Sequence, residues 1–390
     1  MSRTRVTVVG AGLVGSTAAL GLARAGFDVR LIERSAPQPN RGALGVDIRN
    51  VALSPASAAL LDEVGAWRDV DKAPYQRMMV WEQWGSGRVL FEAAEVARAE
   101  LGWVVEMSPL VCALWSAVEQ HPGISIELGQ LQEVEFGIEG VELCFASGKT
   151  INAEFVIAAD GARSRIRQAL DVPLVEKSMD QVALATVVRT EKPHENTAWQ
   201  RFSSGGPLAF LPASDPHVCS VVWSQTAEQA QQRMALPDQA FCEEIALALE
   251  HQLGAVTSLD KRVSFPLTQQ RVTNCAPRPD VLLLGDAMRV IHPLAGQGVN
   301  LGLEDVAQML KIARAQDNLR DPRAWQHFAH RRAARSEAMI AVMSGLHKLY
   351  TSTDPLLSLL RNTGARSFNA LAALKGAVMR EAMGLAPAAK

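Results

Sequence analysis

The sequence predicts an α/β protein: a parallel sheet of the nucleotide-binding type, an inserted antiparallel sheet and a C-terminal helical tail. Three observations predict it. Short apolar runs lead directly into glycine-rich or acidic turns, which is typical of buried parallel strands followed by helices. A central segment alternates apolar and polar residues, which indicates antiparallel strands. From Arg323 onward the chain reads as helices, with breaks at Pro355 and Gly364.

The first of these strands begins near residue 5. Residues 5–9 read as a strand, 13–25 as a helix ended by Gly26, and 29–32 as a second strand that closes on Glu33. Between the first strand and the helix lies a GxGxxG turn, whose glycines permit a tight turn, approach of a pyrophosphate and helix packing. Glu33 has the position of an acid that accepts from a ribose hydroxyl. The order predicts a Rossmann-type nucleotide site formed by Gly10, Gly12, Leu13, Val14, Gly15, Glu33 and Arg34.

The segment 281–302 identifies the nucleotide. Residues 281–284 read as a buried strand, and Asp286 follows it at the sheet edge where open α/β sheets hold their ligands. Pro293 then breaks the backbone, and Gly296 opens a helix whose free backbone N–H groups face an anion. A flavin requires an acidic residue that accepts a hydrogen bond from a ribityl hydroxyl. It also requires a helix N-terminus that stabilises negative charge on the reduced ring. FAD is therefore the predicted cofactor.

A third strand and turn lie between these two motifs. Residues 155–159 read as a buried strand, and Asp160-Gly161 turns into a helix after it. Taken alone, this could be an ordinary strand-to-helix turn. Its place between the other motifs favours a contact with the cofactor.

Together the three motifs resemble the class A flavoprotein aromatic hydroxylases of the para-hydroxybenzoate hydroxylase type. The chain is more similar to the ubiquinone-biosynthesis hydroxylases (the UbiH, UbiF and UbiI group), over nearly its whole length. The segment 189–224 looks most like the UbiI branch, which is thought to hydroxylate C5 of the ring. The matching segments are 47–54, 101–106, 210–212, 221–223, 292–302 and 382–385.

The resemblance implies an FAD monooxygenase that uses NAD(P)H and O2, and transfers oxygen through a C4a-hydroperoxyflavin. Its substrate would be a polyprenylated phenol or benzoquinol, and other proteins of ubiquinone biosynthesis would be partners. NAD(P)H would bind transiently over the Asp160-Gly161 side. Further cofactor contacts carried over from the resemblance or the motifs are Arg49, Asp160, Gly161, Asp286, Pro293, Gly296, Gly298, Val299 and Asn300.

Two positions depart from the family pattern. The family has Ala-His at the positions where this chain has Met288-Arg289. It has Asn at the position where this chain has Met107. Because arginine stays charged at all accessible pH, Arg289 should place a fixed cation near the cofactor. It would pair there with a phosphate or with Asp160; the alternative is a side chain that extends to solvent.

The domain boundaries follow from this layout. Residues 1–75, 103–180 and 275–335 are predicted to form a discontinuous FAD-binding domain, and 76–102 with 181–274 a substrate domain. Residues 336–390 form the C-terminal helical region. Trp223, Phe210 and Trp81 are the predicted substrate-pocket residues, although a buried tryptophan is equally often part of a core.

The sequence does not assign a catalytic base. His292, Pro293 and Gly296 are the candidates near the flavin, and His292 is more simply a structural histidine than a base. His327 and His330 have the spacing of two metal ligands, but several arginines surround them. A solvated basic face is the better interpretation, and no metal is predicted.

Composition narrows the remaining choices. The 390 residues carry a net charge of −2 and five scattered cysteines, which argues against nucleic-acid binding and favours a reducing compartment. With no long apolar run, the predicted location is cytoplasmic. Apolar and basic residues between 354 and 385 suggest peripheral contact with the inner membrane, and packing of this tail on the parent domain is the alternative.

Two other functions stay open on the sequence. One is a flavin oxidoreductase of the same fold that does not hydroxylate, such as a reductase or oxidase. The other is an inactive scaffold subunit of a biosynthetic complex, against which the three retained flavin motifs argue. A disulfide reductase is disfavoured because a second GxGxxG turn and a redox cysteine pair are missing from the sequence.

Overall fold

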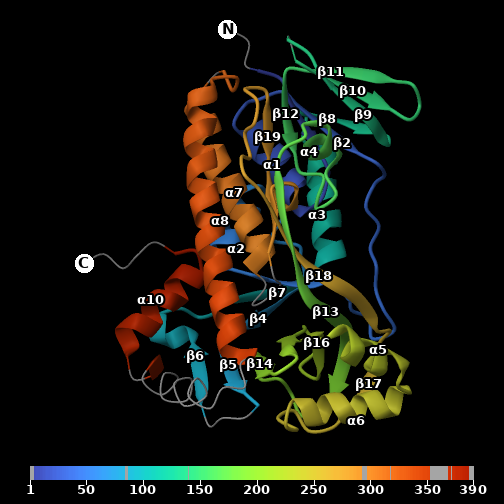
Figure 1. Ribbon diagram of the computed structural model, residues 1–390, viewed down its shortest axis with the longest axis vertical. Coiled ribbons are helices and arrows are strands. Elements are labelled where there is room, and N and C mark those ends of the chain that lie inside the picture. The colour runs from blue at the N-terminus through green and yellow to red at the C-terminus, as the bar shows by residue number, and fades with distance from the viewer. Residues whose placement is uncertain are drawn as a thin grey trace.

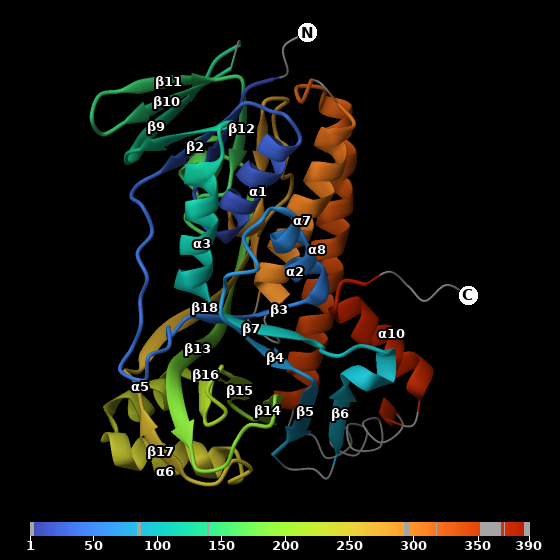
Figure 2. The same cartoon turned by 180° about the vertical axis from the view of Figure 1, so that it is seen from behind.

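Figures 1 and 2 show the computed structural model from opposite sides; it describes residues 4–83, 87–138, 140–291, 297–316, 318–351, 368–369 and 371–385. The predicted α/β class is confirmed. A parallel sheet lies near the N-terminus and a large mixed sheet at the opposite end, with two long strands, β13 (Leu174–Thr190) and β18 (Val263–Val272), running toward it. No helix in the described ranges combines the length and the apolarity needed to span a bilayer.

The five-stranded sheet is parallel throughout and has the order β19-β12-β1-β2-β8. Its inner strands are almost entirely apolar and buried, as the short apolar runs predicted. On one side α1 packs against α3 and α7; the side chain of Leu310 on α7 fits closely over Gly21, where a Cβ would displace it. The strands and helices are β1 (Val6–Val9), α1 (Leu13–Arg24), β2 (Val29–Glu33), α3 (Met107–Gln120), β8 (Ile124–Leu128), β12 (Phe155–Ala158), α4 (Arg165–Ala169), β19 (Val281–Leu283) and α7 (Gln297–Arg314).

The nine-stranded sheet forms the other half of the molecule, with the order β20-β18-β13-β16-β15-β14-β5-β6 and β17 beside β13. Almost all of its pairs are antiparallel, as predicted, but β5 and β14 are parallel. The strand β5 comes from a separate, earlier part of the chain than β14. The other elements are β5 (Arg77–Glu82), β6 (Arg88–Glu92), β14 (Thr197–Ser203), β15 (Gly206–Pro212), β16 (Val218–Gln225), α5 (Ala227–Ala235), α6 (Asp238–Ala248), β17 (Val256–Leu259) and β20 (Arg289–Val290).

Two small sheets and the C-terminal helices complete the fold. One sheet has the order β11-β10-β9 and contributes buried residues to the core of the parallel sheet; the other has the order β3-β7-β4 and lies between the two halves. The helix α8 runs along α7 and reaches β14, while α10 packs on the short helix η1. The elements are β3 (Asn50–Leu53), α2 (Pro55–Glu63), β4 (Lys72–Tyr75), η1 (Ala93–Val96), β7 (Gly102–Glu106), β9 (Leu131–Phe136), β10 (Val141–Phe145), β11 (Thr150–Ala153), η2 (Gly285–Ala287), α8 (Pro322–Thr351) and α10 (Ala372–Ala382).

Candidate active site

The glycine turn after β1 has the conformation that a phosphate-binding turn requires. Gly10 has φ of +100°, and a Cβ there would overlap the backbone of Ala159. A Cβ on Gly15 would overlap the carbonyl oxygen of Gly10. Gly12 differs from both, because a Cβ there would find no atom of a described residue within 4 Å. The chain therefore keeps open space beside Gly12 at the N-terminus of α1.

The open space beside Gly12 belongs to a hollow of about 450 Å³, the nucleotide hollow. Glu33 lines it and is held by the turn, since its carboxylate accepts from the backbone N–H of Ala11 at 2.6 Å and of Arg34 at 2.7 Å. The predicted residues that the structure brings together here are Gly10, Gly12, Glu33, Arg34, Asp160 and Gly161.

Asp160 has an unusual environment at the edge of the nucleotide hollow. One carboxylate oxygen accepts from the backbone N–H of Arg165 at 2.8 Å, and the other is buried without a hydrogen bond. Burial raises the pKa of this carboxyl, against the opposing effect of its hydrogen bonds. Arg163 and Arg165 line the same hollow and were not predicted as site residues. Their spacing after the Asp160-Gly161 turn is the signal that could have identified them.

The loop that carries Arg49 is organised by Asp47. The carboxylate of Asp47 is fully buried and accepts from the backbone N–H groups of Arg49 and Ser108, each at 3.0 Å. The Arg49 side chain itself is exposed. Asp47 was not predicted as a site residue, because a sequence does not show which acid of a loop becomes buried.

An apolar cavity of about 360 Å³ lies between the nine-stranded sheet, β3, β4, the first turn of α7 and α10. Most of its wall consists of aliphatic and methionine side chains. The predicted cofactor residues Asp286, Gly298, Val299 and Asn300 line one side of it. Burial raises the pKa of Asp286, and the nearby cation of Arg289 opposes that shift. The cavity thus places an apolar space beside the residues assigned to the flavin.

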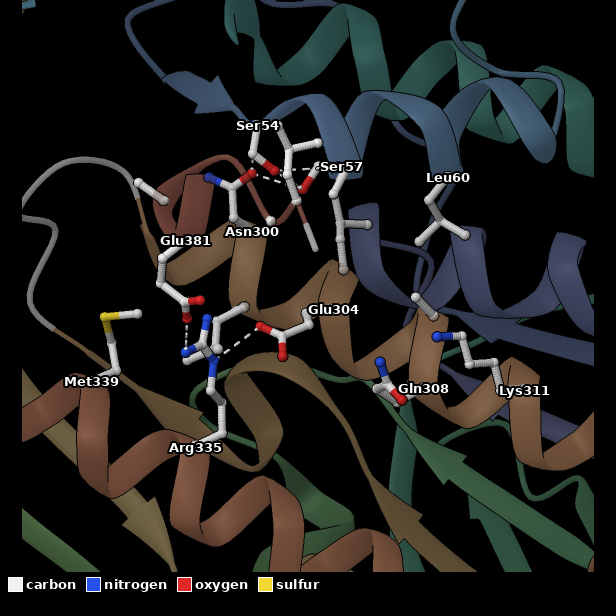
Figure 3. Close-up of a pocket in the computed structure, with 17 residues that line it drawn as sticks. Ser54, Ser57, Leu60, Asn300, Glu304, Gln308, Lys311, Arg335, Met339 and Glu381 are labelled. Atoms are coloured by element: carbon white, nitrogen blue, oxygen red, sulfur yellow. Dashed lines mark hydrogen bonds and ion pairs between the residues drawn. The ribbon is translucent and has the colours of Figure 1, made fainter. Parts of the chain in front are cut away.

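Asn300 fixes the start of α7 to the turn between β3 and α2. Its amide nitrogen donates to Ala52 O at 2.8 Å, and its oxygen accepts from Ser54 N at 2.8 Å and Ser57 Oγ at 2.7 Å. Figure 3 shows this group on one wall of a further cavity of about 500 Å³, bounded by α2, α7, α8 and the end of α10. Asn300 and Ser54 line both this cavity and the apolar cavity. They therefore form part of the wall between the two.

Three contacts hold α10 over the apolar cavity. Glu381 forms an ion pair with Arg335 of α8, visible in Figure 3, and Lys375 pairs with Glu95 of η1 at 2.7 Å. The carbonyl oxygen of Met383 accepts from the backbone N–H of Ala56 at 3.3 Å. The C-terminal helix is thus a wall of the site.

Comparison with known proteins decides the family. Residues 3–342 match the family model described as an FAD binding domain. The chain belongs to this FAD-binding family. It is 34% identical to the 3-demethoxyubiquinol 3-hydroxylase of Escherichia coli, over 98% of this chain and 99% of the relative. It is also 30% identical to the ubiquinone hydroxylase UbiL of Rhodospirillum rubrum, over 97% and 89%.

Solved structures support the same fold. The p-nitrophenol 4-monooxygenase PnpA of Pseudomonas putida has a TM-score of 0.78 at 16% identity, covering 99% of this chain and 100% of its own. HpxO of Klebsiella pneumoniae, complexed with FAD and uric acid, has a TM-score of 0.75 at 17% identity, covering 99% and 98%. The chain is a flavoprotein monooxygenase with the expected fold.

The residues of this FAD-binding chain fit the cofactor. The clearance beside Gly12 leaves room for a pyrophosphate, and the start of α1 directs backbone N–H groups toward it. The side chain of Val14 packs against Gly285 and Gly302 and joins α1 to η2 and α7. Leu13 is buried in the core beneath the turn. These two residues therefore support the turn.

The substrate-pocket prediction needs a correction. Trp81, Phe210 and Trp223 do not line the apolar cavity; they lie on the opposite face of the nine-stranded sheet, in the core beneath α6. Trp81 Nε1 donates to Glu250 at 3.1 Å, and the Arg233 guanidinium lies 3.8 Å from the centre of the Trp223 ring. Successive side chains of a strand point to opposite faces of the sheet. The alternation of apolar and polar residues therefore predicted two faces, but it did not show which face meets the cavity.

The cavity face is formed by the alternate residues of the same strands. Their side chains are small or aliphatic, with one amide among them. The pairings Gln200 with Ala209 and Ala209 with Val222 place these residues in one row across the sheet. The residues from these strands are Met78, Ala198, Gln200, Ala209, Leu211 and Val222.

Two expectations for the Arg289 side chain are wrong, while its pairing with a cofactor phosphate stays a prediction. Arg289 is 4% exposed, so it does not extend to solvent, and its ion pair at 2.8 Å is with Asp305 of α7 instead of Asp160. Asp305 also pairs with Arg332 of α8 at 2.5 Å. The sequence could not show this because Asp305 and Arg332 come from separate helices. His292, Pro293 and Gly296 lie outside the described residues.

Proposed function

We propose that this chain hydroxylates the aromatic ring of a polyprenylated phenol or quinol in ubiquinone biosynthesis. The observation that carries the proposal is the apolar cavity, which adjoins the cofactor residues Asp286 and Asn300 and is walled by hydrocarbon side chains. The relatives named as ubiquinone hydroxylases support the substrate class. A hydrophobic phenol is the kind of molecule such a cavity binds.

The proposed reaction is balanced by O2 and NAD(P)H. One oxygen atom enters a ring C–H bond, which becomes C–OH, and the other oxygen atom leaves as water. The two electrons come from NAD(P)H, which becomes NAD(P)⁺, and one proton comes from solvent. Bound FAD supplies the chemistry that accepts the hydride and activates O2.

The side chains supply binding, orientation and exclusion of water. The hydrocarbon wall of the apolar cavity keeps the reacting ring away from solvent, which limits loss of oxidising equivalents as peroxide. Tyr75 lines this cavity, and burial raises its pKa to about 12. Its hydroxyl therefore stays protonated at neutral pH and acts as a hydrogen-bond donor toward substrate.

An isotope experiment tests the proposal. Purified protein with FAD, NAD(P)H, ¹⁸O2 and a short-chain prenylated phenol should yield a hydroxylated product that carries one ¹⁸O, detected by mass spectrometry. The Gly12→Val variant, purified by the same procedure and expected to lack FAD, is the matched control. Hydrogen peroxide without labelled product would support the non-hydroxylating oxidase; a complete lack of NAD(P)H oxidation would support the scaffold subunit. The position of the label also tests the predicted C5, since the E. coli relative is named for position 3.

The proposal includes access of the prenyl chain from a lipid surface at α10. Leu371, Leu374 and Val378 share one face of this segment and are 55%, 50% and 44% exposed. Val378 also lines the apolar cavity, so this outer face is continuous with the site. An apolar helix face of this kind suits peripheral contact with a bilayer.

Two α10 variants test lipid-side access. Leu374→Glu should lower hydroxylation of a long-chain substrate in liposomes several-fold and leave a short-chain analogue in solution unaffected. Ala373→Glu adds the same charge on another exposed face of the helix and should change neither rate. Equal losses on both substrates in Leu374→Glu would show that this face is only structural.

A further inference from the structure

Among the residues of the nine-stranded sheet that line the apolar cavity, one carries an amide side chain. Gln200 lies on β14 with Ala209 beside it on β15 and Val80 beside it on β5. Ala198 and Val222 extend the same surface, and both line the cavity with Gln200. A glutamine here interrupts an otherwise apolar wall.

The amide of Gln200 forms no hydrogen bond within the part of the chain that the structure describes. The side chain is 6% exposed, and neither its oxygen nor its nitrogen has a partner among the described residues. Other amides on the cavity wall are bonded: Asn50 donates to Asp47 O, and Asn300 is held on both of its polar atoms. Gln200 therefore differs from the amides that build the wall.

A buried amide in hydrocarbon surroundings requires a partner. When a bound hydrophobic molecule displaces water from the cavity, leaving this amide unpaired costs free energy. The amide offers two donors and an acceptor, so it can accept from a phenol O–H and donate to a carbonyl or methoxy oxygen. A prenyl chain offers neither. The matching group is an oxygen substituent on an aromatic ring.

A second polar group lines the same cavity. The hydroxyl of Tyr75 on β4 has no hydrogen-bond partner among the described residues. Because β4 and β14 belong to different sheets, Gln200 and Tyr75 approach the cavity from separate walls. Two contacts from separate walls would fix the rotation of a flat ring, which one contact cannot do.

We propose that Gln200 binds a ring oxygen of the aromatic substrate and, with Tyr75 as a second contact, determines which ring carbon faces the cofactor. This inference rests on the proposed function, since it presumes a phenol or quinol in the apolar cavity. It assigns to Gln200 the selection of oxygenated rings over plain hydrocarbons of the same shape.

A binding cycle tests the proposal with the FAD-loaded protein. The probes are a short-chain prenylphenol and the corresponding prenylbenzene, which differ only in the ring hydroxyl, and the measurement is the change in flavin absorbance on titration. Gln200→Leu should weaken binding of the prenylphenol about tenfold, which corresponds to ~1.4 kcal/mol. It should leave binding of the prenylbenzene unchanged. The share of NAD(P)H oxidation that ends in hydrogen peroxide should rise with the phenol.

Gln181 offers a matched control in the same sheet. It is 7% exposed, but its amide nitrogen donates to Gly205 O at 2.6 Å, and it does not line the apolar cavity. Gln181→Leu should lower the thermal unfolding temperature and preserve the ratio of the two affinities. If Gln200→Leu does not fold, Gln200→Met keeps the length of the side chain and repeats the measurement.

The outcomes separate this inference from the proposed function. An FAD-loaded Gln200 variant that keeps the parent's preference for phenol over benzene would overturn the role of Gln200, even if the parent hydroxylates its substrate. A parent protein that binds the phenol but yields no labelled product would instead refute the proposed function. A preference lost in Gln200→Leu and kept in Gln181→Leu would support the inference.

Discussion

A substitution at Gly12 should weaken FAD binding without destabilising the fold, so Gly12 is the most informative position to substitute. A Cβ at Gly12 would meet no atom within 4 Å among the residues that the structure describes, and Gly12 has φ of −69°, a value that any amino acid adopts. At Gly15, three residues along α1, a Cβ would overlap the carbonyl oxygen of Gly10 and lie 3.2 Å from Ala159 Cβ. Gly12→Val and Gly15→Val should therefore fail for different reasons.

The expected magnitudes follow from that geometry. The valine at position 12 fills the space assigned to the pyrophosphate. Losing even two charge-assisted hydrogen bonds there costs about 3 kcal/mol, which is roughly a hundredfold in Kd. Its free energy of unfolding without FAD should stay within about 0.5 kcal/mol of the parent's. Gly15→Val should lose about 3 kcal/mol or more of folding stability, because the overlap is with backbone.

Two measurements decide the matter. Urea unfolding of the FAD-free proteins gives stability, and titration with FAD, followed by quenching of flavin fluorescence, gives Kd. A yellow, fully loaded Gly12→Val protein would refute the assignment of the nucleotide hollow. So would a Gly12→Val protein destabilised as strongly as Gly15→Val, because the open space would then not exist.

Two further predictions concern buried groups. Arg332→Met should lower the free energy of unfolding by about 3 kcal/mol in urea titrations, because it leaves the fully buried Asp305 with one partner fewer. Arg289→Met should cost less, about 1 kcal/mol, since two of the Arg289 guanidinium nitrogens have no hydrogen bond; equal losses would contradict this. Burial lowers the pKa of His194, so below pH about 6.5 the unfolded chain binds a proton that the folded chain resists, and stability should fall as pH decreases. His194→Gln should reduce that slope between pH 7.5 and 5.5, and an unchanged slope would refute the role of His194.

The nucleotide motif could be predicted because its determinants are local. The strand, the glycine turn, α1 and the acid Glu33 follow one another within a short stretch, and each is specified by residues near it in the chain. Asp286 after β19 was equally clear for the same reason. The family resemblance added the reaction type, which the local pattern does not contain.

The substrate side could not be predicted in the same way. Period-two alternation in β14, β15 and β16 showed that each strand has two faces, but Phe210 and Trp223 were assigned to the wrong one. Which face becomes core depends on where α6 packs, and that is decided by contacts between distant parts of the chain.

The sequence by itself determined the α/β class and the glycine turn, and it predicted the acids assigned to the flavin, because backbone conformation and apolar periodicity are local properties. Only the tertiary structure decided that Gln200 faces the cavity, that Arg289 pairs with Asp305, and that α10 closes the site. These arrangements join segments more than a dozen residues apart, and they depend on which surfaces are buried together when the chain folds.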